Sequence, residues 1–405
     1  FRQGRNSLYN MADTPLSFSA EQTPPELAGD ASSRVSKVLG EIYELNVASL
    51  FHDANLDALT YWMSEDGSAF TQMSGEVFTY TSTVEVEKVF RFKAKDKEAY
   101  SPEYTLTLSF AADPTLDLLE WKVNNTNTVT ITKCDTSVME MVIPAQIEGR
   151  PVAVIGKGAF NNADGPCDKL TKLVLPDSLT TIESGAFTGC SALANVKLSK
   201  NLKMIGDTAF LNCASLTSLT LPDSVTFIGD RAFQGTGLSQ LTLPKSLETL
   251  GARVFHGTNI LSLELPAALK NVGALTFVGI LHNTLNLTLD TGNPYLTIKD
   301  SVLYNKDMTK LIVAFGSVAQ HFTVPDSVVD LGDYAFFNVQ IRSFTFGANV
   351  RTIGNYVFAG QTSDGYSNST LPAATNTLSS VTFNAKLETL GNGAFAGTSI
   401  TSAVL

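Results

Sequence analysis

Three oxygen-bearing side chains at alternate positions, Asp53, Asn55 and Asp57, are the first candidates for chemistry in this sequence. Oxygen donors spaced in this way within a tight loop can surround a hard cation such as calcium. The run lacks the glycine and the distal glutamate of a complete calcium loop, and Asp and Asn also favour turns that hold no metal. Two interpretations therefore stay open, a calcium site and a plain turn, and the plain turn is favoured.

Three of the four cysteines form a second candidate. Cys167, Cys190 and Cys213 recur at intervals of 23 residues, each three residues before a leucine. Zinc sites use closely paired cysteines and a fourth ligand, whereas free cysteine often serves as a small buried apolar side chain. Thr236 and Thr258 occupy the same position in later copies of the pattern. A buried ladder of small side chains is therefore favoured over a thiolate cluster, and a disulfide between two of the cysteines stays open.

The four histidines belong to no recognisable catalytic pattern. They stand at unrelated positions, and the sequence contains no zinc-protease motif, triad spacing, P-loop or dinucleotide fingerprint. We therefore expect a protein without enzymatic activity and without a cofactor. The enzymatic alternative requires a pocket with converging charged groups near His256 or His282.

A repeated segment of 22 or 23 residues organises most of the chain and must position the cysteines and three of the four histidines. Its clearest copy is LTSLTLPDSVTFIGDRAF, which covers residues 216–233 and ends at a phenylalanine. The same closing phenylalanine stands at positions 160, 187, 210, 233, 255 and 277. A fixed period in this range predicts a solenoid, in which each repeat forms one coil of a stack.

Each part of the segment has a physical role in such a coil. Leu219 and Leu221 alternate with polar residues, which predicts a strand with one buried face, and Pro222 ends the strand because it cannot donate to a ladder. The position of Gly229 holds glycine in eight of nine copies. We expect this glycine to allow a backbone conformation that a side chain would hinder. Phe233 is expected to fill the core between coils.

The pattern LxxLxLPxSLxxIGxxAF resembles the BspA-like leucine-rich repeats of bacterial surface proteins, and the resemblance covers about residues 115–405. Residues 121–160 are similar to the opening coil of such arrays, and residues 300–336 are similar to an enlarged repeat that carries a hairpin. The resemblance implies a right-handed leucine-rich-repeat solenoid with parallel strands and short helical turns.

The residues before the array differ from it in pattern. Residues 16–112 contain short alternating segments, such as VFTY and VFRFK, separated by turn residues. This pattern predicts an antiparallel β-sandwich, and the segment resembles the cadherin-like or immunoglobulin-like modules of bacterial surface proteins. We therefore predict a mainly β chain with a flexible lead-in at 1–15, a β-sandwich at 16–112 and the solenoid at 113–405. Because the chain stops inside a repeat, the solenoid is expected to be incomplete at its C-terminal end.

The balance of charge limits the classes of partner. The chain has 39 acidic and 28 basic residues, for a formal net charge of −11. Such a chain repels the phosphate backbone of nucleic acids and anionic membrane surfaces. No apolar run approaches the ~20 residues that a membrane helix requires, so membrane insertion is not expected either.

The strand positions that face solvent form a candidate binding face. One row, which we call the threonine row, consists of Val174, Lys197, Thr220, Thr242, Glu264, Thr288, Thr323, Thr345 and Thr382. Threonine suits an exposed strand on propensity alone, so a plain solvent-exposed surface and a binding platform are both open. The insertion Gln361–Thr377 is a further candidate for recognition, although a tolerated surface loop is the favoured interpretation.

The leading hypothesis is a non-enzymatic, secreted or cell-surface bacterial protein that acts as an adhesin. Its repeat array would bind a surface or matrix protein of a host or neighbouring cell, and we expect it to act as a monomer. The alternative is a glycan-binding accessory protein that acts through the β-sandwich. That alternative predicts an aromatic-lined patch within residues 16–112, formed with Tyr61 and Trp62.

Overall fold

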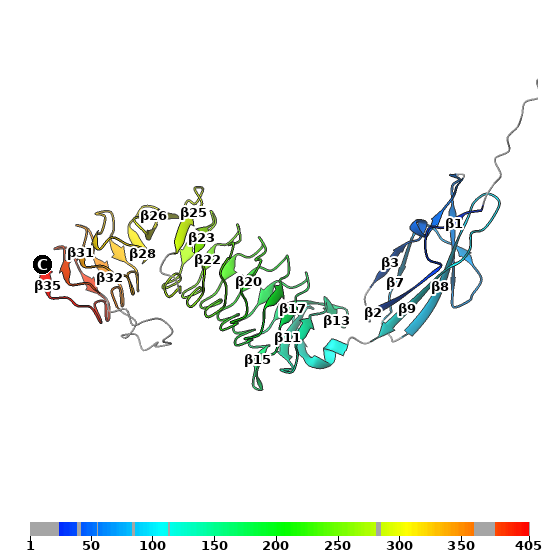
Figure 1. The fold of residues 1–405 in the computed structure, drawn as a ribbon, viewed down its shortest axis with the longest axis horizontal. Coiled ribbons are helices and arrows are strands. Elements are labelled where there is room, and N and C mark those ends of the chain that lie inside the picture. Colours follow the sequence, from blue (N-terminus) through cyan, green and yellow to red (C-terminus); the bar gives the residue numbers. More distant parts are fainter. Residues whose placement is uncertain are drawn as a thin grey trace, which may run out of the picture. The chain divides into compact units, whose positions relative to one another are not determined.

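The computed structural model describes residues 24–38, 42–54, 56–82, 86–111, 114–280, 285–359 and 377–404. The chain divides into two compact units, Phe1–Asp113 and Pro114–Leu405 (Figure 1). In the described residues, helix is confined to two short 3-10 segments, η1 (Val47–Leu50) and η2 (Pro114–Leu118). The chain is therefore mainly β, as predicted. The predicted lead-in, residues 1–15, lies outside the described residues.

The first unit is built around a five-stranded sheet. The strands of this unit are β1 (Glu26–Leu27), β2 (Ser32–Val38), β3 (Tyr43–Asn46), β4 (Phe51–His52), β5 (Thr60–Glu65), β6 (Thr71–Gln72), β7 (Val77–Tyr80), β8 (Val86–Lys95) and β9 (Tyr104–Ala111). The sheet has the order β2-β9-β8-β5-β6, and β1–β4 and β3–β7 form two antiparallel pairs. Because β2 runs parallel to β9, the expectation of an entirely antiparallel module is wrong at this edge. Alternating side chains reveal which face of a strand is buried, but not its direction.

Two layers of strand meet across the core of the first unit. From Phe90 onward every second residue of β8 is buried, so Phe90 and Phe92 face the same side of the sheet. Phe78 of β7 covers them, with its ring centroid 4.7 Å from that of Phe90 and 5.1 Å from that of Phe92. The β3–β7 pair therefore packs over one side of the sheet, and the opposite side of β8 faces solvent.

The second unit winds through successive coils, and most coils contribute one strand to each of two series. It opens with the antiparallel pair β10 (Leu119–Val123) and β11 (Val129–Cys134). The first series, the leucine series, contains β12 (Glu140–Val142), β17 (Lys172–Val174), β19 (Asn195–Lys197), β23 (Ser262–Leu265), β25 (Asn286–Leu289), β29 (His321–Thr323), β31 (Ser343–Thr345), β33 (Ser380–Thr382) and β35 (Ser402–Val404).

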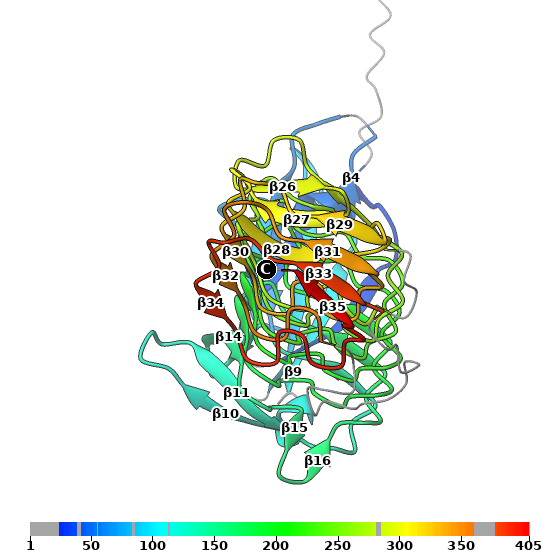
Figure 2. The ribbon, with the colours of Figure 1, turned by 90° about the vertical axis from the view of Figure 1, so that its left-hand side faces the viewer.

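The second series, the isoleucine series, lies on another side of the coils, as Figure 2 shows for the last repeats. It contains β14 (Arg150–Ile155), β18 (Thr181–Ile182), β20 (Met204–Ile205), β21 (Phe227–Ile228), β22 (Thr249–Leu250), β24 (Asn271–Val272), β28 (Lys310–Ala314), β30 (Asp330–Leu331), β32 (Thr352–Ile353) and β34 (Thr389–Leu390). The remaining strands are β13 (Gln146–Ile147), β15 (Asn161–Asn162), β16 (Gly165–Pro166), β26 (Leu296–Lys299) and β27 (Val302–Asn305).

Neighbouring coils pair in parallel, offset by one repeat. Ile182 lies opposite Ile205, and Ile205 lies opposite Ile228, so the same position of successive repeats is aligned. In the leucine series Leu173 lies opposite Val196 in the same way. This register confirms that one repeat forms one coil.

An enlarged repeat interrupts the stack. Strands β26, β27 and β28 form an antiparallel meander, and β28 then pairs in parallel with β30 of the next coil. The meander confirms the hairpin that was predicted within residues 300–336, although it begins earlier, at Leu296. It also divides the isoleucine series into two sheets, one ending at β24 and one beginning at β26.

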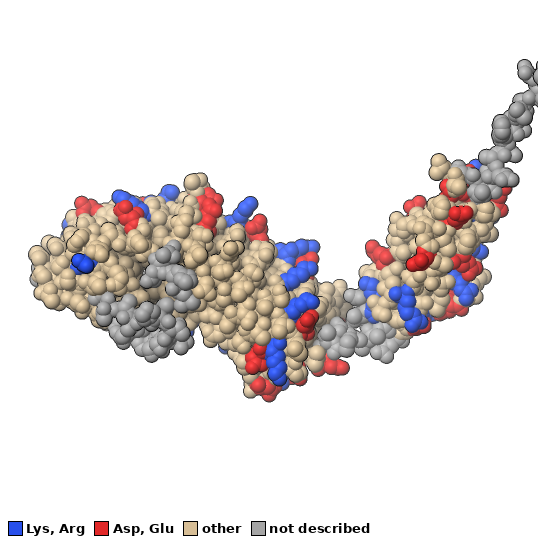
Figure 3. Space-filling view, viewed as in Figure 1, with Lys and Arg blue, Asp and Glu red and all other residues tan. Residues whose placement is uncertain are grey.

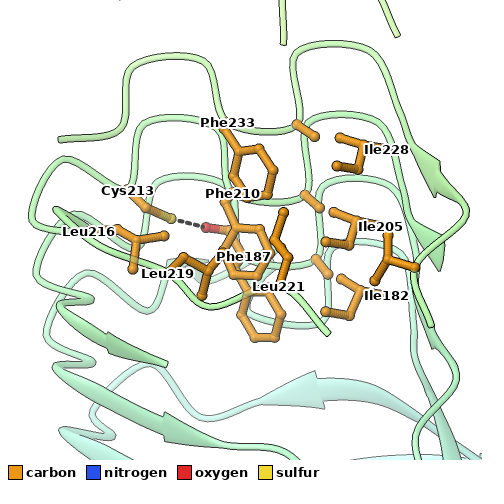
Figure 4. Packing of buried hydrophobic residues seen from close by; sticks show 14 of the residues in the cluster. Ile182, Phe187, Ile205, Phe210, Cys213, Leu216, Leu219, Leu221, Ile228 and Phe233 are labelled. Atoms are coloured by element: carbon orange, nitrogen blue, oxygen red, sulfur yellow. Dashed lines mark hydrogen bonds between the residues drawn. The ribbon is translucent and has the colours of Figure 1, made fainter. Parts of the chain in front are cut away.

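The phenylalanines that close the repeats stack along the core (Figure 4). The ring centroids of Phe187 and Phe210 are 5.2 Å apart, those of Phe210 and Phe233 are 5.7 Å apart, and all three rings are fully buried. Because each ring packs on its equivalents in the neighbouring coils, no coil completes its core alone. The predicted role of Phe233 is confirmed.

The glycine of each repeat serves a different purpose from the one expected. Neither Gly229 nor Gly251 has a positive φ, so neither supplies a special backbone conformation. A Cβ atom on Gly229 would lie 2.5 Å from the backbone nitrogen of Asp207, and one on Gly251 would lie 2.6 Å from that of Asp230. Glycine is needed here because the backbones of neighbouring coils approach too closely for any side chain.

A left-handed residue stands two positions before the closing phenylalanine in all nine copies of this turn. These residues are Gly158, Gly185, Thr208, Arg231, Arg253, Leu275, Tyr334, Tyr356 and Gly393, with φ between 51° and 67°. A left-handed residue interrupts a right-handed helix. The expectation of short helical turns in the coils is therefore wrong, because these turns are irregular.

Side chains that follow the glycine link neighbouring coils. Asp207 accepts a hydrogen bond from the backbone N–H of Asp230 at 2.9 Å, and Asp230 accepts one from Ala252 at 2.7 Å. Asp333 accepts one from the N–H of Asn355 at 2.7 Å. These bonds give an acceptor to backbone N–H groups that would otherwise lack one at the turn between the two strand series.

Candidate functional site

The threonine row lies on the outer side of the leucine series. On β23 and β25 the leucines Leu263 and Leu287 are buried, whereas the intervening Glu264 and Thr288 are exposed and lie opposite each other. The same alternation continues in the later coils, where Thr345 lies between Thr323 and Thr382 in the ladder. The exposed members of the row are Lys197, Thr220, Thr242, Glu264, Thr288, Thr323 and Thr345. Val174 and Thr382 are half-buried.

The strands behind this face form three separate sheets. They are β12-β17-β19, β23-β25 and β29-β31-β33-β35. Between the first two sheets, the coils that carry Thr220 and Thr242 are joined on this side only by the bridge between Ser218 and Gln240. Leu219 and Leu221 therefore do not lie in the regular β-strand that was predicted for them. Both leucines are nevertheless buried, so the outward direction of Thr220 was predicted correctly.

Charge on this face is concentrated at the first coils. Lys172 pairs with Glu140 at 3.3 Å, and both side chains are largely exposed. Lys172, Lys197 and Ser218 line a shallow depression of roughly 270 Å³. On the side of the array shown in Figure 3, charged side chains also gather over the first coils. From Thr220 onward the threonine row carries only one charged residue, Glu264.

One histidine lies on the same face. His321 Nδ1 and Ser343 Oγ are 2.6 Å apart, on adjacent strands β29 and β31. His321 is exposed, and no carboxylate among the described residues pairs with it. An open surface without a third group to orient the imidazole lacks the arrangement of a catalytic triad.

The enzymatic alternative required charged groups that converge near His256 or His282. His256 is half-buried, and its Nδ1 lies 3.1 Å from the carbonyl oxygen of Val278. A cavity of roughly 370 Å³ lies beside Val278, but every residue that lines it is uncharged. His282 lies outside the described residues. The described residues that line the cavity therefore offer no acid or base to a substrate.

The calcium candidate is only partly described. Asn55 lies outside the described residues, and Leu56 between Asn55 and Asp57 adopts a left-handed φ of 61°. Lys97 Nζ lies 2.8 Å from Asp57 Oδ1, and this hydrogen bond raises the pKa of Lys97. In the described ranges, no three His, Cys, Asp or Glu side chains gather as metal ligands do. The ammonium of Lys97 thus neutralises Asp57, and calcium binding stays a prediction.

The cysteines form the predicted buried ladder of small side chains. All four are free thiols and fully buried. Cys213 Sγ donates to the carbonyl oxygen of Phe187 in the preceding coil at 3.2 Å (Figure 4), and burial raises the pKa of Cys213 to about 12. In later coils Thr236 and Thr258 donate from the same position to phenylalanine carbonyls. These threonines are also buried, so the position accepts a small side chain in the core and the structure favours a packing role.

The aromatic patch that the glycan alternative required is present in the first unit, but its composition differs from the prediction. Tyr61 faces the core, where it packs near Phe51 and burial raises its pKa. Trp62 lies on the outer face of the sheet and packs edge-on against Tyr100, with ring centroids 5.9 Å apart. The alternating cations Arg91, Lys93 and Lys95 on β8 lie on the same outer face as Trp62. The period of two along VFRFKAK could have revealed them.

The remaining features are the predicted insertion and the possibility of a membrane-spanning helix. Residues 361–376 of the predicted insertion lie outside the described residues, and Thr377 Oγ1 donates to the carbonyl oxygen of Ile341 at 3.1 Å. Within the described ranges, none of the helices has the length and apolarity needed to span a bilayer.

A family model described as "BspA type Leucine rich repeat region" matches residues 153–283 and 296–405, in six copies. No curated protein matches this sequence. Three solved structures are similar in fold. A leucine rich cell surface protein from Faecalibacterium prausnitzii is 21% identical with a TM-score of 0.47, and the match covers 73% of this chain and 94% of that one.

The other two structures cover similar shares. The pneumococcal vaccine antigen PcpA is 18% identical with a TM-score of 0.47, and the match covers 71% of this chain and 84% of that one. A leucine-rich repeat protein from Bacteroides ovatus is 21% identical with a TM-score of 0.46, and the match covers 71% of this chain and 75% of that one.

Proposed function

Since this chain belongs to the family of BspA-type leucine-rich repeat proteins, we propose that it is a non-enzymatic bacterial protein, secreted or held at the cell surface, whose repeat array binds a protein of a host or neighbouring cell. The observation that carries the proposal is the threonine row. Seven of its nine side chains are exposed, while most of the apolar residues that alternate with them are buried. Extended repeat surfaces of this kind commonly serve as binding faces.

The chemistry of the row suits a protein partner of low charge. Hydroxyl groups both donate and accept hydrogen bonds, and small side chains allow the partner's backbone to approach closely. Strand spacing places successive members of the threonine row about 4.8 Å apart, so a partner meets a regular set of polar groups. The row contains no aromatic residue, so affinity would come from contact area rather than from a few buried anchors. In this proposal the first unit, a cadherin-like or immunoglobulin-like β-sandwich, acts as a spacer, and the protein acts as a monomer.

A pair of matched substitutions tests the proposal in the full chain. Thr345→Arg places a bulky charge at the centre of the last sheet of the leucine series, and Thr389→Arg places the same charge on the exposed β34 of the isoleucine series. After a screen of host matrix and cell-surface proteins identifies a partner, we expect Thr345→Arg to weaken binding about tenfold or more, because the interface must then desolvate a charge. Thr389→Arg should leave it unchanged. Equal effects of the two substitutions, or no binding protein in the screen, would count against the proposal.

A further inference from the structure

The outer face of the sheet in the first unit carries a mixed cluster of aromatic and cationic side chains, which we call the β8 patch. Its members are Trp62, Phe70, Arg91, Lys93, Lys95 and Tyr100. Residues 91, 93 and 95 alternate on β8 with Phe92 and Ala94, which are fully buried. The three cations therefore point away from the core.

The rings and cations of the β8 patch contact one another. Lys93 Nζ lies 4.0 Å from the ring centroid of Phe70 and 4.0 Å from that of Tyr100. Lys95 Nζ lies 5.1 Å from the centroid of Tyr100. Trp62 lies opposite Lys93 in the ladder and packs against the edge of Tyr100 at an interplanar angle of 78°. These cation–π contacts hold the ammonium groups beside the rings, so the patch forms one continuous surface.

The cations of the β8 patch are without an ion-pair partner in the described part of the chain. Among the described residues, no carboxylate forms an ion pair with Arg91, Lys93 or Lys95, whereas Lys88 on the same strand pairs with Glu65 at 2.8 Å. The nearby carboxylate of Asp96 instead accepts hydrogen bonds from the backbone N–H groups of Glu98 and Ala99. On a chain with a net charge of −11, the β8 patch is therefore a local concentration of positive charge.

We propose that the β8 patch binds an acidic polysaccharide, a glycan that carries carboxylate or sulfate groups. Alternate residues of a strand lie roughly 6.6–6.8 Å apart, so Arg91, Lys93 and Lys95 present a row of cations to successive anionic groups of an extended polymer. Tyr100 is 42% exposed and Trp62 lies beside it, so the rings offer an apolar surface to the C–H face of a sugar. This binding is independent of the threonine row.

The position of the β8 patch argues against the other polymers. β8 is hydrogen-bonded to β9 on one side and to β5 on the other, so a peptide cannot add to it as a further strand. Single-stranded nucleic acid binds by stacking successive bases on open ring faces. Here Trp62 packs against Tyr100 at an interplanar angle of 78°, so these two rings do not offer parallel faces to successive bases.

Calorimetric titration of the full chain tests the proposal. The probes are heparin, which carries sulfate, hyaluronan, which carries only carboxylate, and neutral dextran. We expect at least one acidic glycan to bind, dextran not to bind, and affinity to fall as salt rises because bound counterions are released. Comparison of heparin with hyaluronan identifies which anionic group is recognised.

Variants connect the binding to the β8 patch. Trp62→Ala, and separately the pair Arg91→Gln and Lys95→Gln, should each weaken glycan binding by on the order of tenfold. The matched control is the pair Lys172→Gln and Lys197→Gln, which removes the same charge from the array and should change nothing. Lys93 is left intact because it packs between two rings. If Trp62→Ala lowers the melting temperature of the first unit, Tyr100→Ala serves as the second aromatic variant.

Four outcomes would overturn the proposal. Dextran could bind as tightly as the acidic glycans, or none of the three could bind. Polyglutamate or single-stranded DNA could bind as tightly as the acidic glycans, which would indicate attraction to any polyanion. Folded aromatic variants could retain full affinity, which would show that the rings of the β8 patch only stabilise the sheet.

Discussion

At the scale of single residues, the glycine of each repeat stands where the backbones of two neighbouring coils come into close contact. A turn that needs a positive φ and a backbone contact that excludes a side chain both select glycine. Only the spacing between coils distinguishes them, and that spacing is a property of the stack. The structure shows close contact at Gly251, where an added Cβ would meet Asp230 of the preceding coil.

This distinction gives a testable prediction for Gly251→Ala. Because the neighbouring atoms belong to the backbone, the coils must separate, and we expect the array to lose roughly 1–3 kcal/mol of unfolding free energy. Gly75→Ala is the matched control, since Gly75 has no positive φ and no atom within 4 Å of the added Cβ. Urea unfolding of the two variants provides the measurement. If the two variants have equal free energies of unfolding, the coils separate at Gly251 without an energetic cost.

At the scale of elements, the left-handed residue of each turn was the feature that the sequence concealed. Glycine marks it in only three of the nine copies, at 158, 185 and 393, and the others include Thr208 and Tyr356. A side chain at positive φ costs about 1–2 kcal/mol per residue, so the stack of coils holds these residues in a conformation they would not choose alone.

Thr208→Gly tests this interpretation. Glycine removes the steric cost of the left-handed conformation but adds about 0.5–1 kcal/mol of chain entropy to the unfolded state, so we expect a net gain of up to about 1 kcal/mol. Thermal unfolding compares this variant with Gly185→Thr, the reverse change at the same position of the preceding coil, which should lose stability. A loss of stability in Thr208→Gly would mean that the threonine side chain makes a compensating contact.

Prediction of the elements succeeded where one pattern determined one outcome. The period of the closing phenylalanines predicted the coils, and the alternation around Leu263 and Leu287 predicted the outward row. Prediction failed where the sequence pattern did not determine strand direction or pairing. Alternation carries no information on the direction of β2, and the repeat does not show that regular pairing is lost between Thr220 and Thr242. The β8 patch was found only in part, because Tyr61 and Trp62 are adjacent and point to opposite sides of the sheet.

At the scale of the whole molecule, the buried residues of the array fall into two large clusters and one small one. One large cluster extends from the earlier coils into the meander and includes Phe160 and Phe255, and the other begins in the meander and includes Phe336 and Phe358. The small cluster contains residues from both parts of the array. Stability in a repeat protein is approximately a sum of coil and interface terms, so we expect that parts with separate large cores can open separately.

Hydrogen exchange of the full chain tests this division with a single substitution. Phe336→Ala should cost about 3–5 kcal/mol within the second cluster, and it should raise amide exchange after residue 302 far more than in the earlier coils. Phe210→Ala is the matched change in the first cluster and should give the opposite distribution. Uniform loss of protection along the array would show that it opens as one unit.

The register of the coils has a consequence for how such a molecule can change over generations. Successive coils repeat the same inward contacts and expose outward side chains of their own. A duplication of one 22-residue unit would therefore lengthen the surface by about 4.8 Å without requiring a new type of core. Contact area for a partner can thus grow or shrink by whole steps, while substitutions within a step alter what is recognised. The length of the surface and its binding specificity can therefore change independently.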